Sequence, residues 1–121
     1  TQGTIDGKYI GHTDESLCEE GKAQLKDIME NYGDYPEVDA VFCSPLKRCI
    51  ETAQTIYPDR NPIILDDLRE YDFGEFEGKT AEELQDDEDF AEWLSGANPN
   101  KAAPLGDSQV RFNYRNCRWR N

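Results

Sequence analysis

The stretch Val38-Asp-Ala-Val-Phe-Cys-Ser-Pro-Leu-Lys-Arg48 decides the fold that the sequence predicts. Its first six residues form an apolar run of strand length that is rich in β-branched and aromatic side chains. Ser44 is a favourable N-cap and Pro45 suits the first helical position, so a helix is expected directly after the strand. Apolar residues then recur at helical spacing, at Leu46, Ile50, Ala53 and Tyr57.

A helix that starts at the end of a strand presents free backbone N–H groups and a positive dipole end to the space above that strand. Arg48, on the first turn, adds a planar and permanently charged guanidinium group. The turn therefore predicts a phosphate pocket. The alternative at this point is that Arg48 only pairs with one of the many carboxylates of the chain.

Other segments continue the alternation of helices and strands. A helix capped by Asp14 or Ser16 is expected to run to about Tyr32, with Gly33 as its C-cap. Residues 61–65 predict a short strand, residues 66–78 a glycine-punctuated aromatic loop, and the capping box of residues 80–83 a further helix. This order predicts an α/β fold with a mostly parallel sheet.

Composition restricts the classes of function. The chain has 26 acidic and 13 basic residues among 121, and the net charge of -13 argues against a nucleic-acid partner. The 36% hydrophobic content is low for a full core, and no apolar run is long enough for a membrane span, so a cytoplasmic location is expected. The four cysteines lack the spacing of a metal site and are expected to be free thiols.

Four segments carry a resemblance to a known family. Residues 44–53, Ser-Pro-Leu-Lys-Arg-Cys-Ile-Glu-Thr-Ala, resemble the SPLxRxxxTA signature of the histidine phosphatase (phosphoglycerate mutase-like) superfamily. Residues 9–21 resemble the segment after the family's Arg-His-Gly motif, residues 68–78 its LxExxFGxWEG segment, and residues 104–108 its PGGES turn. The resemblance implies a three-layer α/β fold with a mostly parallel sheet flanked by helices, which we expect to be incomplete at both ends.

The resemblance also implies which groups are missing. In this family the nucleophile is the histidine of an Arg-His-Gly-x-Thr motif, which the chain matches only from Thr1 onward. The nucleophile is therefore expected just upstream of residue 1, and nothing after Ser108 supplies the family's second active-site histidine. His12 lies in a glycine loop outside that motif, so it is expected to be a surface or rim histidine. We expect this chain alone to be inactive.

The resemblance assigns roles to individual residues. Arg48 is expected to clamp the phosphoryl group, and Glu70 to protonate the leaving group and later activate water, beside a partly desolvated wall of aromatic side chains at Tyr71, Phe73 and Phe76. The expected phosphate-binding residues are Thr1, Thr4, Ile10, Gly11 and Arg48. Thr4 stands where many relatives carry asparagine. This chemistry requires no metal ion and no organic cofactor.

The branch of the family follows from what the chain lacks. Residues 78–93 are short, acidic and free of arginine, which favours a phosphomonoester hydrolase over a mutase. The motifs are most similar to those of bacterial broad-specificity or alpha-ribazole phosphatases, the latter acting in cobalamin biosynthesis, so the expected partner is a small phosphorylated metabolite. Two alternatives remain: a phosphoglycerate mutase-type phosphotransferase, and a non-catalytic anion-binding pseudoenzyme module.

The last 13 residues differ from the rest. Residues 109–121 contain four arginines and no acidic residue, and they show no clean apolar stripe at helical spacing. We therefore divide the chain into a partial histidine phosphatase domain at residues 1–108 and an atypical basic tail at residues 109–121. A reading-frame change near residue 108 and an unusual basic arm are the two interpretations of that tail.

Overall fold

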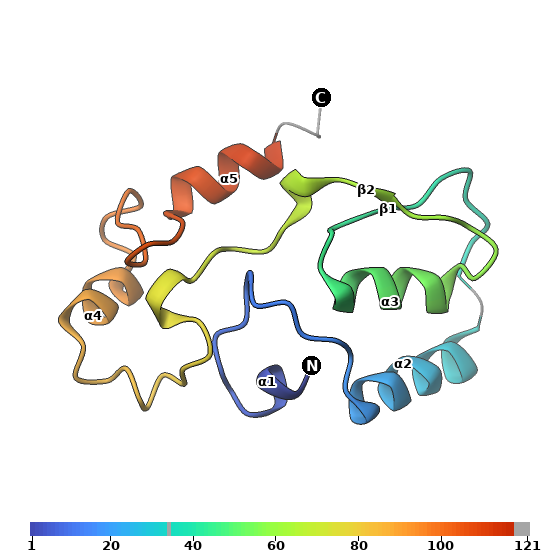
Figure 1. Ribbon diagram of the computed structural model, residues 1–121, viewed down its shortest axis with the longest axis horizontal. Helices are drawn as coiled ribbons and strands as arrows, with labels where there is room; N and C mark the ends of the chain where they lie inside the picture. Colours follow the sequence, from blue (N-terminus) through green and yellow to red (C-terminus); the bar gives the residue numbers. More distant parts are fainter. Residues whose placement is uncertain (34, 118–121) are drawn as a thin grey trace.

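The computed structural model describes residues 1–33 and 35–117, and Figure 1 shows the course of the chain. The elements follow one another as α1 (Gln2–Ile5), α2 (Glu19–Tyr32), β1 (Phe42–Cys43), α3 (Lys47–Ile56), β2 (Ile63–Ile64), the 3₁₀ turns η1 (Asp66–Leu68) and η2 (Gly74–Phe76), α4 (Glu88–Ser95) and α5 (Gln109–Cys117). The strands lie with α2 and α3 at one end of the molecule, and α4 lies at the other end (Figure 1).

The sheet in the described part of the chain is a parallel pair. Phe42 lies opposite Ile63 and Cys43 opposite Ile64, with α3 as the connection between the strands. The predicted α/β arrangement with parallel pairing is confirmed. The strands are shorter than the predicted ranges 38–43 and 61–65, because each strand has one partner here and ladder bonds form only where both backbones run side by side.

Helix α3 begins at Lys47, two residues later than predicted, and Ser44 is not its cap. The Ser44 hydroxyl instead accepts a hydrogen bond from the Leu46 backbone N–H at 3.3 Å, which holds residues 44–46 in a turn. The cap comes from a distant loop, because Asp14 Oδ1 accepts from the Lys47 N–H at 2.7 Å.

Two other helix starts also differ from prediction. The N-cap of α2 is Cys18, whose Sγ accepts from the Gly21 N–H at 3.4 Å, and neither predicted cap is used. Asp14 accepts from the Lys47 N–H of α3, and the Ser16 side chain hydrogen-bonds to Glu51. Thr80 Oγ1 accepts from the Glu83 N–H at 3.2 Å as the capping box predicts, yet only turns follow. Helix α4 starts after Asp87, where an aspartate cap and acidic first-turn residues suit the helix dipole.

The core lies between α4, α5 and the loop around η2, and it is mainly aromatic. Its buried members are Tyr71, Phe76, Leu84, Phe90 and Ala103, with Tyr9, Phe73, Trp93 and Phe112 packed against them. The hydroxyl of Tyr71 donates to the Asp107 carbonyl oxygen and accepts from Trp93 Nε1 at 2.9 Å. Burial raises the pKa of Tyr71, so this hydroxyl stays a donor at neutral pH.

Residues 109–117 form helix α5, although the sequence shows no clean apolar stripe there. Ser108 Oγ accepts from the Arg111 N–H at 3.2 Å and caps α5, and Phe112 packs against the core. A helix without a continuous apolar stripe forms here because a few residues make strong tertiary contacts. Residues 118–121 of the predicted tail lie outside the described residues, and the division of the chain at residue 108 stays a prediction.

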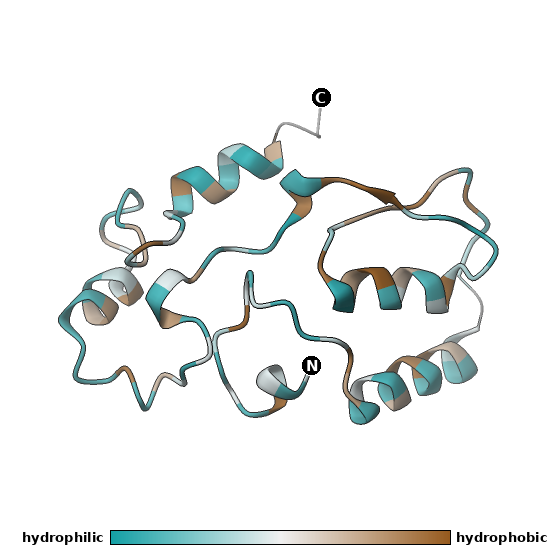
Figure 2. Cartoon of the chain, in the orientation of Figure 1, coloured by the Kyte–Doolittle hydropathy of each residue, from teal (hydrophilic) through white to brown (hydrophobic). Residues whose placement is uncertain are grey.

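Apolar side chains remain exposed on the sheet. Phe42, Ile63 and Ile64 are all exposed, and Figure 2 shows the hydrophobic colouring of the strands continuing onto one side of α3. Within residues 1–33 and 35–117, no helix is long and apolar enough to cross a membrane.

We predict that Phe90→Ala lowers the free energy of unfolding by about 3 to 5 kcal/mol, because it empties a ring-sized space in the aromatic core. Phe90 is 4% exposed. The matched control on the same helix is Leu94→Ala, since Leu94 is 60% exposed and its loss is expected to cost less than about 1 kcal/mol. Denaturant unfolding measures both, and equal midpoints for the two variants would show that the core lies elsewhere.

Candidate functional site

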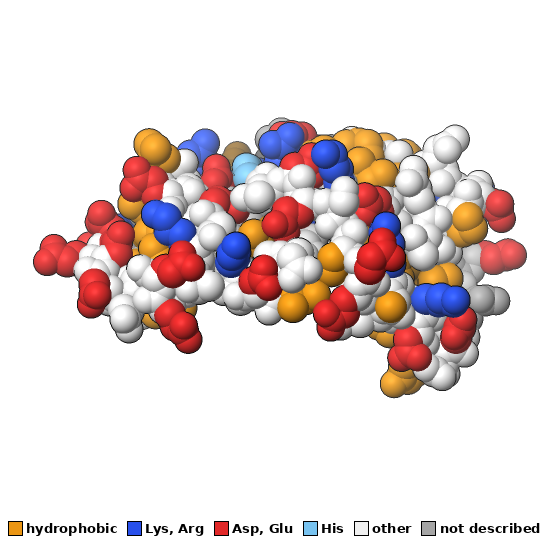
Figure 3. Space-filling view, turned by 60° about the horizontal axis from the view of Figure 1, so that its bottom comes forward, with side chains coloured by type: hydrophobic (Ala, Val, Ile, Leu, Met, Phe, Trp, Pro, Cys, Tyr) orange, Lys and Arg blue, Asp and Glu red, His pale blue; other side chains and the backbone are white. Residues whose placement is uncertain are grey.

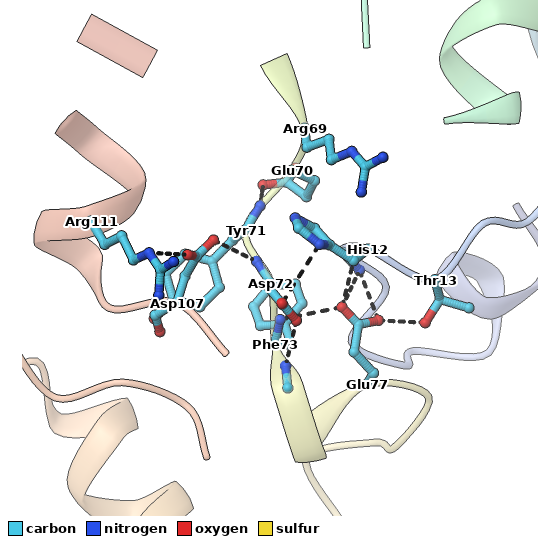
Figure 4. Close-up of polar contacts among 12 residues, drawn as sticks. His12, Thr13, Arg69, Glu70, Tyr71, Asp72, Phe73, Glu77, Asp107 and Arg111 are labelled. Atoms are coloured by element: carbon cyan, nitrogen blue, oxygen red, sulfur yellow. Dashed lines mark hydrogen bonds and ion pairs between the residues drawn. The ribbon is translucent and has the colours of Figure 1, made fainter. Parts of the chain in front are cut away.

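The Glu77 carboxylate joins the loop before α2 to the loop around η2 (Figure 4). Its Oε1 accepts from the backbone N–H groups of His12 at 2.8 Å, Gly11 at 3.1 Å and Phe73 at 3.2 Å, and its Oε2 from the Thr13 hydroxyl at 2.6 Å. Burial by itself would raise the pKa of Glu77, but these hydrogen bonds outweigh it and lower the pKa below its ordinary value. Glu77 is therefore an ionised clamp.

Gly11 lies where the two loops touch. A Cβ atom at this position would overlap the Tyr71 carbonyl oxygen, so only glycine fits. The N–H of Gly11 binds Glu77, and its carbonyl oxygen accepts from Arg48 Nη2 at 2.6 Å. Both backbone polar groups thus hold the loop in place, and a phosphate contact at Gly11 stays a prediction.

Arg48, on the first turn of α3, reaches across to the same loop. Its Nη2 donates to the Gly11 carbonyl and its Nη1 to the Thr13 carbonyl at 2.9 Å. These bonds fix the plane of the guanidinium group and leave its other N–H groups available for a ligand. The structure pairs Arg48 with backbone carbonyls, whereas the alternative drawn from the sequence pairs it with a carboxylate.

A cavity of about 410 Å³ brings most of the predicted site residues together. This volume suits a small-molecule ligand. Four of its lining residues are predicted site residues, and three are additional. The lining consists of Thr4, Ile10, Arg48 and Glu70 together with Lys8, Tyr9 and Phe73.

Thr1 lines a neighbouring cavity of about 600 Å³ that extends along Arg48 to the ends of β1 and α3. Its hydroxyl caps α1 by accepting from the Thr4 N–H at 3.3 Å, and the two threonine hydroxyls lie 3.0 Å apart. Thr1 and Thr4 therefore hydrogen-bond to each other at the junction of the two cavities. Their contacts with phosphate stay predictions.

Glu70 is exposed at the edge of the 410 Å³ cavity. Its Oε1 accepts from the Tyr71 N–H at 2.7 Å, which leaves the carboxylate with free lone pairs. Of the three aromatic residues expected to wall it, Phe73 lines the cavity, whereas Tyr71 and Phe76 are buried in the core. The wall is thinner than predicted because these two rings face the interior.

His12 lies beside Asp72 and away from the cavity lining. Its Nδ1 is 3.6 Å from Asp72 Oδ2 (Figure 4). Its Nε2 is buried and has no hydrogen-bond partner among the described residues. The ring is therefore partly buried in the loop contact, while the His12 backbone N–H serves the Glu77 clamp.

Sequence reasoning assigned no role to three residues that shape the site. Glu77 and Asp107 lie within quoted motifs, but the partners that explain them come from distant parts of the chain. Arg115 lies in the segment taken for an atypical tail, and it donates to the Asp107 carboxylate and to the backbone carbonyls of Arg69 and Glu70. A search for a basic partner for the acidic residue of the 104–108 turn could have found it.

Acidic side chains outnumber basic ones on the surface of this acidic chain. On the described part of the face drawn in Figure 3, acidic side chains are scattered at many places, with lysines and arginines mostly single among them. An anionic ligand therefore meets favourable charge mainly where Arg48 and Lys8 line the cavity.

We predict that Glu77→Gln destabilises the fold by about 1 to 3 kcal/mol at neutral pH, because an amide cannot accept all four hydrogen bonds. The folded-state pKa of Glu77 is lowered, so its stabilisation is complete above the ordinary glutamate pKa of about 4.3 and is lost as pH falls through the folded value. The difference from the wild type should thus narrow in acid. Denaturant unfolding across pH measures it.

The control for this prediction is Glu75→Gln, since Glu75 is exposed in the same turn. Its free energy of unfolding should stay within about 0.5 kcal/mol of the wild type. A constant difference between wild type and Glu77→Gln at every pH would contradict the clamp.

The sequence of this chain is similar to a known family and to two curated proteins. The family model described as "Histidine phosphatase superfamily (branch 1)" matches residues 1–120. Phosphoserine phosphatase 1 of Hydrogenobacter thermophilus is 31% identical over 112 residues, covering 89% of this chain and 52% of that protein. An acid phosphatase of Mycobacterium tuberculosis is 29% identical over 111 residues, covering 90% of this chain and 51% of that protein. The chain spans about half the length of these curated relatives.

Solved structures show the same fold. The alpha-ribazole phosphatase of Shigella flexneri superposes with a TM-score of 0.80 at 29% identity, covering 98% of this chain and 60% of that chain. This match confirms the phosphoglycerate mutase-like α/β fold expected from the sequence, and the family match includes nearly all of the segment after residue 108. The chain belongs to branch 1 of the histidine phosphatase superfamily, and the two curated relatives described above are phosphatases.

Proposed function

We propose that this chain carries the phosphate-binding arginine and the acid-base glutamate of a phosphomonoester hydrolase that works through a phosphohistidine. The single observation that carries the proposal is the shared cavity of Arg48 and Glu70. A cation held by two backbone carbonyls faces the same space as a carboxylate with free lone pairs. This is the pair of groups that phosphoryl transfer to a nucleophile needs.

In the proposed reaction a histidine attacks phosphorus in line with the leaving alkoxide. The free N–H groups of Arg48 stabilise the charge that spreads over the phosphoryl oxygens. Glu70 gives its proton to the leaving oxygen as the bond to phosphorus breaks, and the resulting carboxylate takes a proton from the water that hydrolyses the phosphohistidine. The products are an alcohol and inorganic phosphate.

The nucleophile of this reaction is not a residue of this chain. His12 is the one histidine, and its ring lies against Asp72, outside the lining of the cavity. We therefore propose that the chain alone binds phosphate without hydrolysing esters.

The proposed substrate class is a small phosphomonoester with an organic group beside the phosphate. Tyr9, Ile10 and Phe73 give the cavity an apolar wall on which such a group can pack. The name of the Shigella flexneri neighbour supports alpha-ribazole 5'-phosphate as a candidate, and with it a role in cobalamin biosynthesis. Tighter binding of simple sugar phosphates than of alpha-ribazole 5'-phosphate by this chain would remove that candidate.

We predict that the chain binds inorganic phosphate and that Arg48→Met weakens this binding about tenfold or more, because hydrogen bonds to a charged ligand are lost. The control is Lys47→Met, since the neighbouring Lys47 side chain is exposed and outside the cavity lining. Titration calorimetry measures the affinity. In the same preparation, p-nitrophenyl phosphate should not be hydrolysed.

Two results would contradict the proposal. Equal phosphate affinity in the wild type and Arg48→Met would show that Arg48 does not hold the phosphate. Steady-state hydrolysis that is abolished by His12→Asn would show that His12 is the nucleophile after all.

A further inference from the structure

Arg115 on α5 reaches the backbone that carries Glu70. Its Nη2 donates to the carbonyl oxygen of Glu70 at 3.0 Å and to that of Arg69 at 3.2 Å. Its Nη1 donates to Asp107 Oδ2 at 3.0 Å. We propose that Arg115 is the positioning residue for Glu70, an inference that rests on the proposed acid-base role of Glu70.

The backbone at residues 69 and 70 needs such a partner. These residues follow η1 and belong to no helix or strand, so their carbonyl groups take no part in the hydrogen bonds of a helix or a sheet. A carbonyl without a partner would leave the peptide planes free to turn. By bonding two successive carbonyls, one guanidinium group fixes the orientation of the peptide planes on both sides of the Glu70 Cα atom.

Asp107 in turn fixes Arg115. The Asp107 side chain is 5% exposed, and its Oδ2 also accepts from the Asp72 N–H at 3.0 Å (Figure 4 shows this part of the contact). The Asp107 N–H donates back to the Asp72 carbonyl oxygen at 2.8 Å. A buried carboxylate needs a charged partner, and Arg115 supplies that charge while its fork extends to residues 69 and 70.

The bracket made by Asp107 and Arg115 therefore holds the chain on both sides of Tyr71. The Arg115 side chain is 18% exposed, and its guanidinium group lies 5.5 Å from the centre of the Phe112 ring. Tyr71 itself is locked in the aromatic core. Only the Glu70 side chain is left to face the cavity, where a small displacement of an acid-base group has a large effect on reaction rate.

The matched control is Arg111 on the same helix. Its Nε lies 3.7 Å from Asp107 Oδ1, and its side chain is 75% exposed. It has no hydrogen bond to the carbonyls of residues 69 and 70 in the described structure. Arg111→Met removes the same charge from the same helix without touching the backbone of Glu70.

The test is a double-mutant cycle between Arg115 and Glu70, with phosphate affinity of the chain at mildly alkaline pH as the readout. Glu70→Gln should tighten phosphate binding about threefold or more, because it removes a like charge from the cavity. Arg115→Met should tighten binding similarly in the wild type, because the carboxylate leaves its position, and should change it less than about twofold in Glu70→Gln. Arg111→Met should change phosphate affinity less than about twofold in both the wild type and Glu70→Gln.

A second readout needs no ligand. Hydrogen exchange of the Tyr71 and Asp72 amides should accelerate about tenfold or more in Arg115→Met relative to the amides of α2. Arg115→Lys keeps the charge beside Asp107 but lacks the fork, so it should unfold cooperatively like the wild type and still show the faster exchange. If Arg115→Met does not fold, the amide exchange rates of Arg115→Lys provide the test.

The outcomes separate this inference from the proposed function. If phosphate binding depends on Arg48 but the effects of Arg115→Met and Glu70→Gln are additive, the positioning role is overturned and the proposed function is intact. The same holds if Arg115→Met weakens phosphate binding in both the wild type and Glu70→Gln. Phosphate binding that is absent or independent of Arg48 overturns the proposed function. Unchanged exchange at Tyr71 and Asp72 in Arg115→Lys overturns the bracket itself.

Discussion

One carboxylate determines how the two loops of the site meet. Glu77 collects the N–H groups of Gly11, His12 and Phe73 and the Thr13 hydroxyl. The peptide between Gly11 and His12 directs its N–H to Glu77, so its carbonyl points to the opposite side and accepts from Arg48 Nη2. Thr13 is held by its hydroxyl on Glu77, and its carbonyl accepts from Arg48 Nη1. The direction of the Arg48 guanidinium group therefore depends on a glutamate that lies outside the cavity lining.

The site lies between two parts of the molecule that are stabilised differently. Arg48 comes from the helix beside the parallel strands, where Phe42, Ile63 and Ile64 are exposed. Glu70 comes from a segment that leads directly into the aromatic core through Tyr71. Buried aromatic residues are concentrated in the second part, and the loop of residues 11–13 connects the two parts through its hydrogen bonds to Arg48 and to Glu77.

Structural features that depend on neighbouring residues could be predicted from the sequence, whereas features that depend on residues far apart in the chain could not. The parallel strands joined by a helix, the Gly33 cap and the meeting of Arg48 with Glu70 follow from local patterns and the quoted motifs. The start of α3 could not follow, because its cap is Asp14, 33 residues earlier. Helix α5 was missed for the same reason, since its stability depends on Phe112 in the core and Arg115 on Asp107 rather than on a periodic apolar stripe.

Glu70 and Glu77 show how one loop can give two glutamates opposite tasks. Four donors saturate the Glu77 carboxylate, so protonating it would break hydrogen bonds on which the loop contact depends. Glu70 accepts one hydrogen bond, from the next residue, and the rest of its carboxylate faces an open cavity beside a cation. Of the two carboxylates, only that of Glu77 joins the two loops, whereas that of Glu70 is bonded within its own segment and is free to serve the acid-base role that we propose for it.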